Sequence, residues 1–164
     1  MRDENDPIAR ARTNWEDAGW GEAVADGMEA VTSVMRAHQI MLARVENELK
    51  PFGLTFARFE LLRLLAFSRA GALPISKTSD LLQVHVSSAT SAVARLVEAG
   101  LVERRPHPTD GRTTLVAITE SGREVVEKAT VALNVVFADI GLPPDQSRAL
   151  VDAIRTLRQA NGDF

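Results

Sequence analysis

Apolar residues recur at helical spacing through most of the chain, and prolines or glycines separate the runs. Asp6 and Pro7 suit the start of the first helix, because Asp caps a helix well and Pro is favoured at its first position. The pattern predicts helices over residues 7–18, 22–50, 56–68, 119–139 and 144–160.

The pattern changes over residues 76–119. Two short apolar faces, separated by a break at residues 83–86, predict a pair of short helices. So short a connection is typical of a helix-turn-helix, whose second helix is expected from about Ser87 to Ala99. The predicted inner positions are Leu81, Leu82, Ala89, Val93, Leu96 and Val97.

A β-hairpin is predicted directly after this helix pair. Gly100 ends the second helix, and residues 101–105 alternate between apolar and polar like an edge strand. Residues 107–112 hold the Pro and Asp-Gly of a tight reversal, and residues 113–119 return as a second strand. The hairpin is a two-stranded wing with Arg112 at its tip, and residues 71–74 are expected to be a link before the helix pair.

The outer face of the second helix carries small hydroxyl side chains and one arginine. Such a face can enter the major groove of DNA, where Ser and Thr contact any base and Arg favours guanine. Several hydroxyls in one helix are unfavourable, which indicates a functional reason for them. The residues expected at DNA are Lys77, Ser87, Ser88, Thr90, Ser91, Arg95, Arg105, His107, Asp110, Gly111, Arg112 and Thr113.

Three of these positions have a structural role as well. Ser87 is expected to cap the second helix, and Asp110 to orient Arg112 through a charged hydrogen bond. His107, like His85, is interpreted as a phosphate or turn contact rather than as a metal ligand.

Together these residues resemble the MarR family of winged-helix transcription regulators. That family carries a D-P-x-D-x-R segment, then an aliphatic strand and a T-x-x-G helix start. Pro108, Asp110, Gly111, Arg112, Thr119 and Gly122 match here, whereas His107 replaces the first Asp. The resemblance covers about residues 28–160. It implies a mainly α winged-helix fold of six to seven helices with a two-stranded wing, and dimerisation through helices from both termini.

Composition limits the class of protein. The chain has 164 residues, no cysteine and no long apolar run, and it does not begin with a signal-peptide pattern, so we expect a cytoplasmic soluble protein. Its net charge is −3, yet residues 74–123 hold one more basic than acidic side chain. The expected regions are 1–50 (extension and dimerisation helix), 51–119 (DNA-binding domain) and 120–164 (dimerisation helices).

Two other classes of function fit the sequence less well. Nucleotide-binding, hydrolase and paired-histidine metal motifs do not occur, so neither an enzyme nor a bound metal or cofactor is expected. A helical protein–protein interaction module is the alternative; it explains apolar terminal helices but not the face of hydroxyls and arginine beside a wing. The favoured interpretation is a homodimeric repressor that binds a pseudo-palindromic operator in double-stranded DNA.

The resemblance also implies a small aromatic or anionic effector bound between the dimer helices and the winged helix. The N-terminal helix with its tryptophans is similar to an extension in the urate-responsive subgroup. Residues that could supply aromatic and cationic contacts are Trp15, Trp20, Arg36, His38, Arg58 and Phe59.

Overall fold

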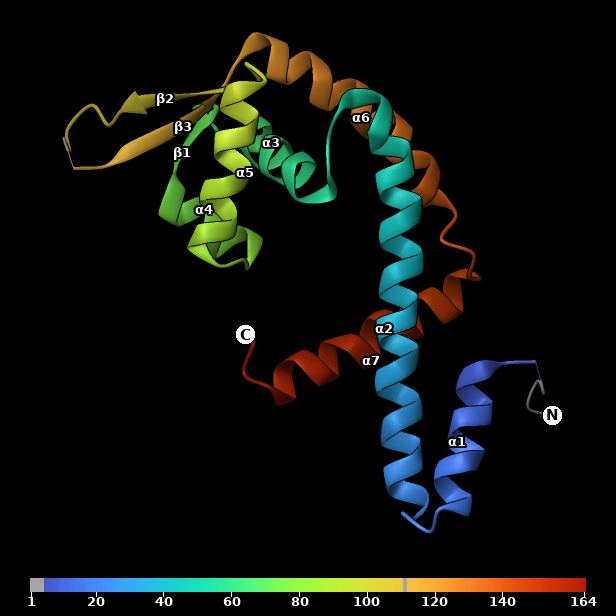
Figure 1. Cartoon of the computed structure of the whole chain (residues 1–164). Coiled ribbons are helices and arrows are strands. Elements are labelled where there is room, and N and C mark those ends of the chain that lie inside the picture. Colours follow the sequence, from blue (N-terminus) through green and yellow to red (C-terminus); the bar gives the residue numbers. More distant parts are fainter. Residues whose placement is uncertain (1–4, 111) are drawn as a thin grey trace.

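The computed structural model describes residues 5–110 and 112–164, in seven α-helices, one short 3-10 helix and three strands. Figure 1 shows a winged head at one end of a long helix. The helices are α1 (Pro7–Asp17), α2 (Glu22–Leu49), η1 (Lys50–Phe52), α3 (Phe56–Phe67), α4 (Ile75–Leu82), α5 (Val86–Glu98), α6 (Glu120–Ala138) and α7 (Pro144–Ala160). Each helix expected from the hydrophobic pattern is present, with bounds shifted by one residue or so.

The sheet has three strands, where the sequence predicted two. They are β1 (Ala72–Pro74), β2 (Val102–Pro106) and β3 (Thr114–Ile118), in the antiparallel order β1-β3-β2. Residues 71–74 were expected to be a link, but Leu73 lies opposite Val116 and extends the sheet. A strand this short shows no alternation in the sequence.

One core holds the head together and continues under α2 and α6. Side chains from α3, α5, β2, β3 and α6 meet there, with Leu61, Leu62, Val93, Val116 and Val126 fully buried. Two residues predicted for the inner faces of the helix pair lie outside this core: Leu81 is 53% exposed and Val97 is 38% exposed. Helices α4 and α5 are short. Each therefore buries fewer of its apolar residues than the sequence pattern predicted.

The T-x-x-G start of α6 is a structural joint. The Thr119 hydroxyl accepts a hydrogen bond from the Gly122 amide at 3.0 Å and donates one to the Gly100 carbonyl at 2.8 Å. A Cβ on Gly122 would collide with the Leu101 carbonyl, so a residue without a side chain is needed there. The joint sets the direction in which α6 leaves the wing.

Helix α1 folds back along the start of α2, far from the head (Figure 1). The Asp6 carboxylate caps it by accepting from the Ile8 amide at 2.9 Å. The buried Arg12 then joins the two helices, with ion pairs to Asp26 and Glu29 of α2. A buried charge is stable only when it is paired in this way.

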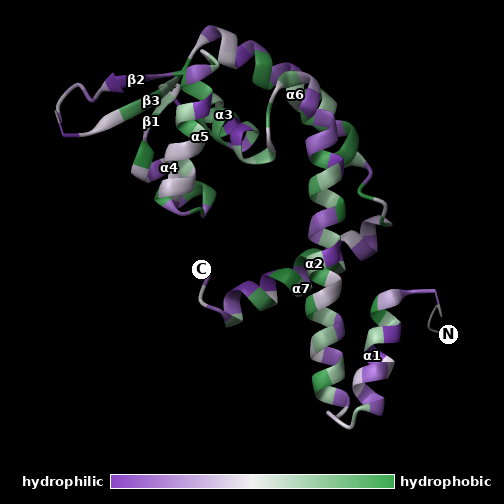
Figure 2. Cartoon of the chain, viewed as in Figure 1, coloured by the Kyte–Doolittle hydropathy of each residue, from purple (hydrophilic) through white to green (hydrophobic). Residues whose placement is uncertain are grey.

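The remaining helices leave apolar surface uncovered. The first half of α2 exposes Val24, Val31 and Met35, and α7 has no buried residue. Figure 2 shows hydrophobic residues recurring along the free length of α2 and along α7. At its far end α7 approaches the turn between α4 and α5, where Arg158 donates to the Gln83 side-chain oxygen at 3.1 Å. No helix in the described ranges is long and apolar enough to span a bilayer.

Candidate nucleic-acid interface

Helix α5 has a buried side and a polar, exposed side. Ala89, Val93 and Leu96 are buried in the head. The opposite side carries the residues predicted to read DNA, and all of them are exposed: Ser87, Ser88, Thr90, Ser91 and Arg95. The face proposed from the sequence is therefore accessible to a duplex.

The cap of α5 differs from the prediction. Ser87 was expected to be the N-cap, but the helix begins at Val86 and His85 caps it, its ring Nδ1 accepting from the Ser87 amide at 3.3 Å. The Ser87 hydroxyl lies 2.8 Å from the same ring nitrogen. The sequence signal was misread because Ser is the commoner cap and His is not among the preferred ones.

The hydroxyls of this face are not equally free. The Thr90 hydroxyl donates to the Val86 carbonyl at 2.8 Å, as Thr often does inside a helix. The Ser88 and Ser91 hydroxyls have no protein partner among the described residues. These two side chains can therefore give both donor and acceptor to another molecule.

The turn of the wing is held by side chains on its own backbone. The His107 ring nitrogen accepts from the amides of Thr109 and Asp110, at 3.3 and 3.2 Å, which makes this histidine a turn residue. The Asp110 carboxylate accepts from the Thr113 hydroxyl at 2.7 Å and from the Arg112 amide at 3.0 Å. These bonds, the Thr113 hydroxyl first, lower the pKa of Asp110 below its ordinary value.

The prediction for Asp110 is thereby corrected. Its carboxylate was expected to hold the Arg112 side chain, but its hydrogen bond goes to the Arg112 main-chain amide. The exposed Arg112 guanidinium is left without an ion pair in the described part of the chain. Gly111, which was also predicted at DNA, lies outside the described residues.

The cations of the helix pair and the wing fall into two groups. Arg95 is paired with Glu98 at 3.1 Å, and Arg105 with Glu103 at 2.6 Å. Lys77, Arg104 and Arg112 are exposed, and within residues 5–110 and 112–164 they form no ion pair. A cation without an acidic neighbour meets a phosphate without first losing an ion pair.

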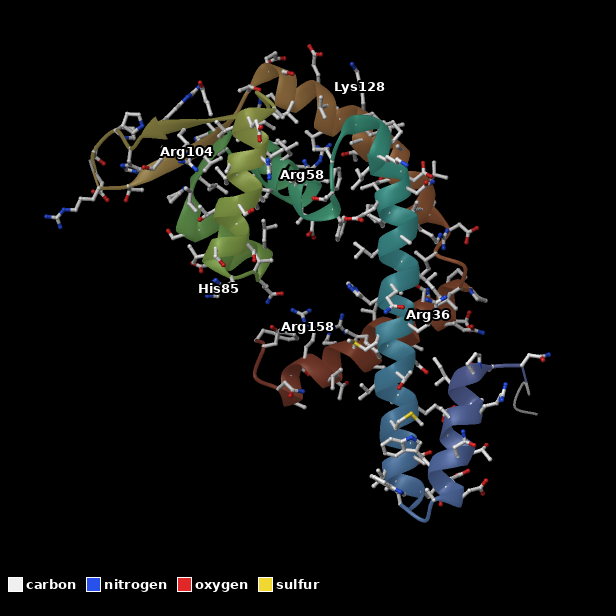
Figure 3. All side chains as sticks on the ribbon, viewed as in Figure 1. Arg36, Arg58, His85, Arg104, Lys128 and Arg158 are labelled. Carbon is white, nitrogen blue, oxygen red and sulfur yellow. The ribbon has the colours of Figure 1, made fainter. Side chains whose placement is uncertain are left out.

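Arg104 was not among the predicted site residues, although the sequence places it in a cluster of arginines. It lies on β2 opposite Val116, and Figure 3 labels it on the wing. From Glu103 onward all of β2 is exposed, which the alternation of an edge strand did not indicate.

The six residues proposed for an effector do not form one site. Trp15 and Trp20 contact each other, with ring centroids 4.9 Å apart, where α1 meets α2. Arg36 is exposed and donates to Gln39. Phe59 is a core residue, only 5% exposed. His38 and Arg58 lie in two different cavities.

The cavity beside His38 is apolar. It has a volume of about 380 Å³ and lies between α2, the start of α3, the end of α6, and α7. Its lining is Val34, Ala37, His38, Met41, Leu42, Val45, Phe56, Phe137, Leu150 and Ile154. His38 is the one ionisable side chain in this lining, so an aromatic or aliphatic molecule suits it. The part of the chain that the structure describes contains no group of three or more His, Asp or Glu arranged for a metal ion.

A short helix pair, an accessible second helix and a charged hairpin together define the class of winged helix-turn-helix proteins. A family model described as "MarR family" matches residues 54–114, the head of this molecule. The crystal structure of Sco5413, a MarR family transcriptional regulator from Streptomyces coelicolor, is 48% identical, with a TM-score of 0.76 over 85% of this chain and 97% of that one. The chain belongs to the MarR family.

Two further matches agree with this assignment. The HTH-type transcriptional repressor IacR of Pseudomonas putida is 36% identical over 93 residues, which are 57% of this chain and 54% of that protein. Sco3205 of Streptomyces coelicolor, a family member solved in complex with DNA, shares the fold at 24% identity, with a TM-score of 0.73 over 83% of this chain and 88% of that one. The chain spans little more than half the length of the curated relatives it matches.

Proposed function

We propose that the protein is a sequence-specific DNA-binding transcription regulator that represses by occupying a pseudo-palindromic operator as a homodimer. The observation that supports it best is the accessible face of α5 beside the wing. Within the described residues the Ser88 and Ser91 hydroxyls have no partner and Arg112 forms no ion pair. In this proposal phosphate contacts from the wing fix the pose of the protein and α5 reads the bases. Such a regulator works without catalysis and in the cytoplasm.

Repression is the proposed outcome of this DNA binding. IacR, which is similar to this chain over 93 residues, is described as a repressor. A protein that fills the major groove over a promoter prevents polymerase from binding there, which is the simplest outcome of such docking.

The dimer is proposed from the uncovered apolar surface. Val131 and Val135 on α6 are 71% and 70% exposed, and the first half of α2 and α7 expose further large apolar side chains. Apolar surface of this extent on a small chain marks a contact with another protein. Two-fold symmetric homodimers are the commonest assembly, and the two α5 helices would then meet successive turns of the duplex. In this proposal residues 1–50 and 120–164 form the dimer and residues 51–119 bind DNA.

An effector is proposed for the apolar cavity beside His38. A molecule held there touches α2, α6 and α7, which carry the dimer, and α3, which belongs to the head. Its binding would shift the population of dimers toward one spacing of the two heads. In this proposal His38 supplies the polar contact to the effector. Trp15 and Trp20 do not line this cavity and would not contact the effector.

The proposed reading face is tested by selecting bound duplexes from a random DNA pool with the wild type and with Arg95→Ala. Arg95 lies on the base-reading side of α5, so the variant should lose enrichment at one position in each half-site and retain the others. Identical selected sequences for both proteins would show that this face does not read bases. A helical interaction module, the alternative, would enrich no sequence at all.

A further inference from the structure

We propose that Arg58 on α3, which the sequence placed with the effector residues, is a DNA-backbone contact that binds a phosphodiester beside α5. The proposal rests on the proposed function, because it needs a duplex on the α5 face. It assigns to the interface a residue from outside the helix pair and the wing.

The first observation is where Arg58 lies. A cleft of about 550 Å³ separates the start of α3 from the reading side of α5, and Arg58 lines it together with Thr55, Ser87, Ser91 and Arg95. Figure 3 labels Arg58 on α3, beside α5. The same face of α5 that is proposed to meet bases therefore forms one wall of this cleft, and Arg58 forms the other.

The second observation is how Arg58 is held. Its Nε donates to the Thr55 hydroxyl at 3.1 Å, which fixes the plane of the guanidinium, and the side chain is partly buried. Among the described residues Arg58 forms no ion pair, and both terminal nitrogens lack a recorded partner. A guanidinium held by Nε and free at its two ends matches the two non-bridging oxygens of a phosphodiester.

The chemistry of the cleft favours an anion. Its lining has two arginines and four hydroxyl side chains, and no carboxylate. Glu98, which pairs with Arg95, does not line it. On the other side of Arg58 a second cleft is lined by Glu46 as well as Lys50, so the favourable charge is on the α5 side.

The position of the cleft favours a duplex over a free effector. When a helix lies in the major groove, a phosphate backbone runs along each side of it, and elements that flank the helix contact those backbones. Arg58 lies on the α3 side of α5, so it would hold the DNA strand whose backbone runs along that side of the helix. An apolar effector, in contrast, suits the cavity beside His38, to which Arg58 does not contribute.

The test measures DNA affinity by fluorescence anisotropy over a series of salt concentrations, on a selected duplex and on a scrambled one. Arg58→Gln, which can still donate to the Thr55 hydroxyl but has no charge, should weaken binding to both duplexes roughly tenfold. The slope of log affinity against log salt should fall by about one, as expected for one lost phosphate contact. Arg58→Lys should keep the slope and lose part of the affinity, because it keeps the charge but not the fork.

Arg10→Ala is the matched control, because Arg10 is an exposed arginine on α1, far from the head (Figure 1). Thermal melting of each variant shows that the fold is intact. If Arg58→Gln binds both duplexes with the affinity and slope of the wild type, the Arg58 proposal is wrong while DNA binding stands. If the wild type binds neither duplex, the proposed function fails and Arg58 falls with it. Thermal melting with and without inorganic phosphate gives one further outcome. If phosphate raises the melting temperature of the wild type but not of Arg58→Gln, and DNA binding is the same for both, Arg58 binds a free anion and the proposal is wrong.

Discussion

Two parts of this molecule, the head and the arm, bury their apolar side chains to different extents. The head, residues 54–118, contributes most of the buried apolar core, and the exposed side of α5 and the wing carry hydroxyls and cations. The arm is the first half of α2 with α6 and α7, and it leaves several valines and Met35 exposed. In α2, 28 residues long, the buried positions are Ala25, Val45 and Leu49, and two of these lie at the end nearest the head.

This contrast indicates which part of the molecule needs a partner. Most of the large apolar residues of the head have neighbours already, with exceptions such as Phe67 and Leu81, so a second copy would add less to its packing. The arm has apolar residues without neighbours in the same chain, and a partner of the same sequence would cover them. The free surface of the head is left for a polar, charged ligand, which is what a duplex offers.

The largest expected effect comes from placing charge on the arm. In the variant Val131→Glu with Val135→Glu, two carboxylates would be buried in the dimer without partners, and each costs several kcal/mol. We expect the protein to sediment as a monomer at micromolar concentration while its circular dichroism stays helical. Ser88→Glu with Ser91→Glu, which places the same two charges on the exposed side of α5 in the head, is the control and should remain dimeric. A dimer that survives the double substitution would place the interface elsewhere.

The next effect concerns the core of the head. Leu62 is fully buried, so Leu62→Ala should lower the free energy of unfolding by about 2–5 kcal/mol through the cavity that it leaves. Urea unfolding followed by circular dichroism measures this loss. Val151→Ala on α7, where the side chain is exposed in the single chain, should cost far less in a monomeric background. Equal losses for the two variants would show that α7 is packed within one chain.

A smaller effect is expected at the wing. Arg112→Ala removes an unpaired cation and should weaken DNA binding by about 1–3 kcal/mol, to a similar extent on different sequences. Electrophoretic mobility shifts on a selected and on an unrelated duplex measure it, with Arg148→Ala on α7 as the comparison. Full affinity in the Arg112 variant would mean that the wing does not reach the duplex.

The smallest effect is a pH dependence in α3. Partial burial raises the pKa of Glu60 above its ordinary value, so the folded state holds this proton more tightly than the unfolded state does. Stability from this group is therefore full below the ordinary glutamate pKa and is lost as the pH rises through the raised one. Glu60→Gln should flatten that part of the stability curve in urea titrations. An unchanged curve would show that Glu60 is well solvated.

The elements of the fold could be predicted from the sequence because most of them are long and amphipathic. A helical period extends over many residues in α2, α6 and α7, and Pro or Gly marks their ends. Strand β1 could not be predicted, because three residues show no period and their pairing depends on where the fold places β3. The inward face of α4 was misassigned at Leu81 for the same reason, since eight residues hold barely two turns.

The candidate site was predictable where its residues are neighbours in the chain. Ser88, Ser91 and Arg95 share a helix, so their common face follows from the helical period. The effector set was not predictable, because Trp15, His38 and Arg58 come from separate helices whose packing the sequence does not display. For the same reason the sequence does not show that Arg58 lies beside α5, because α3 and α5 come together only in the fold.

The proposed dimer binds DNA with two α5 helices. Hydroxyl-radical footprinting of the wild-type protein on a duplex selected from a random pool tests this arrangement directly. We expect two protected segments related by an inverted repeat, with centres about one helical turn, roughly 10 base pairs, apart. Both segments should appear together as protein is added, and the Val131→Glu, Val135→Glu variant should lose them together. A single protected segment with no symmetric partner, equally occupied by the monomeric variant, would contradict a dimer that reads DNA with two α5 helices.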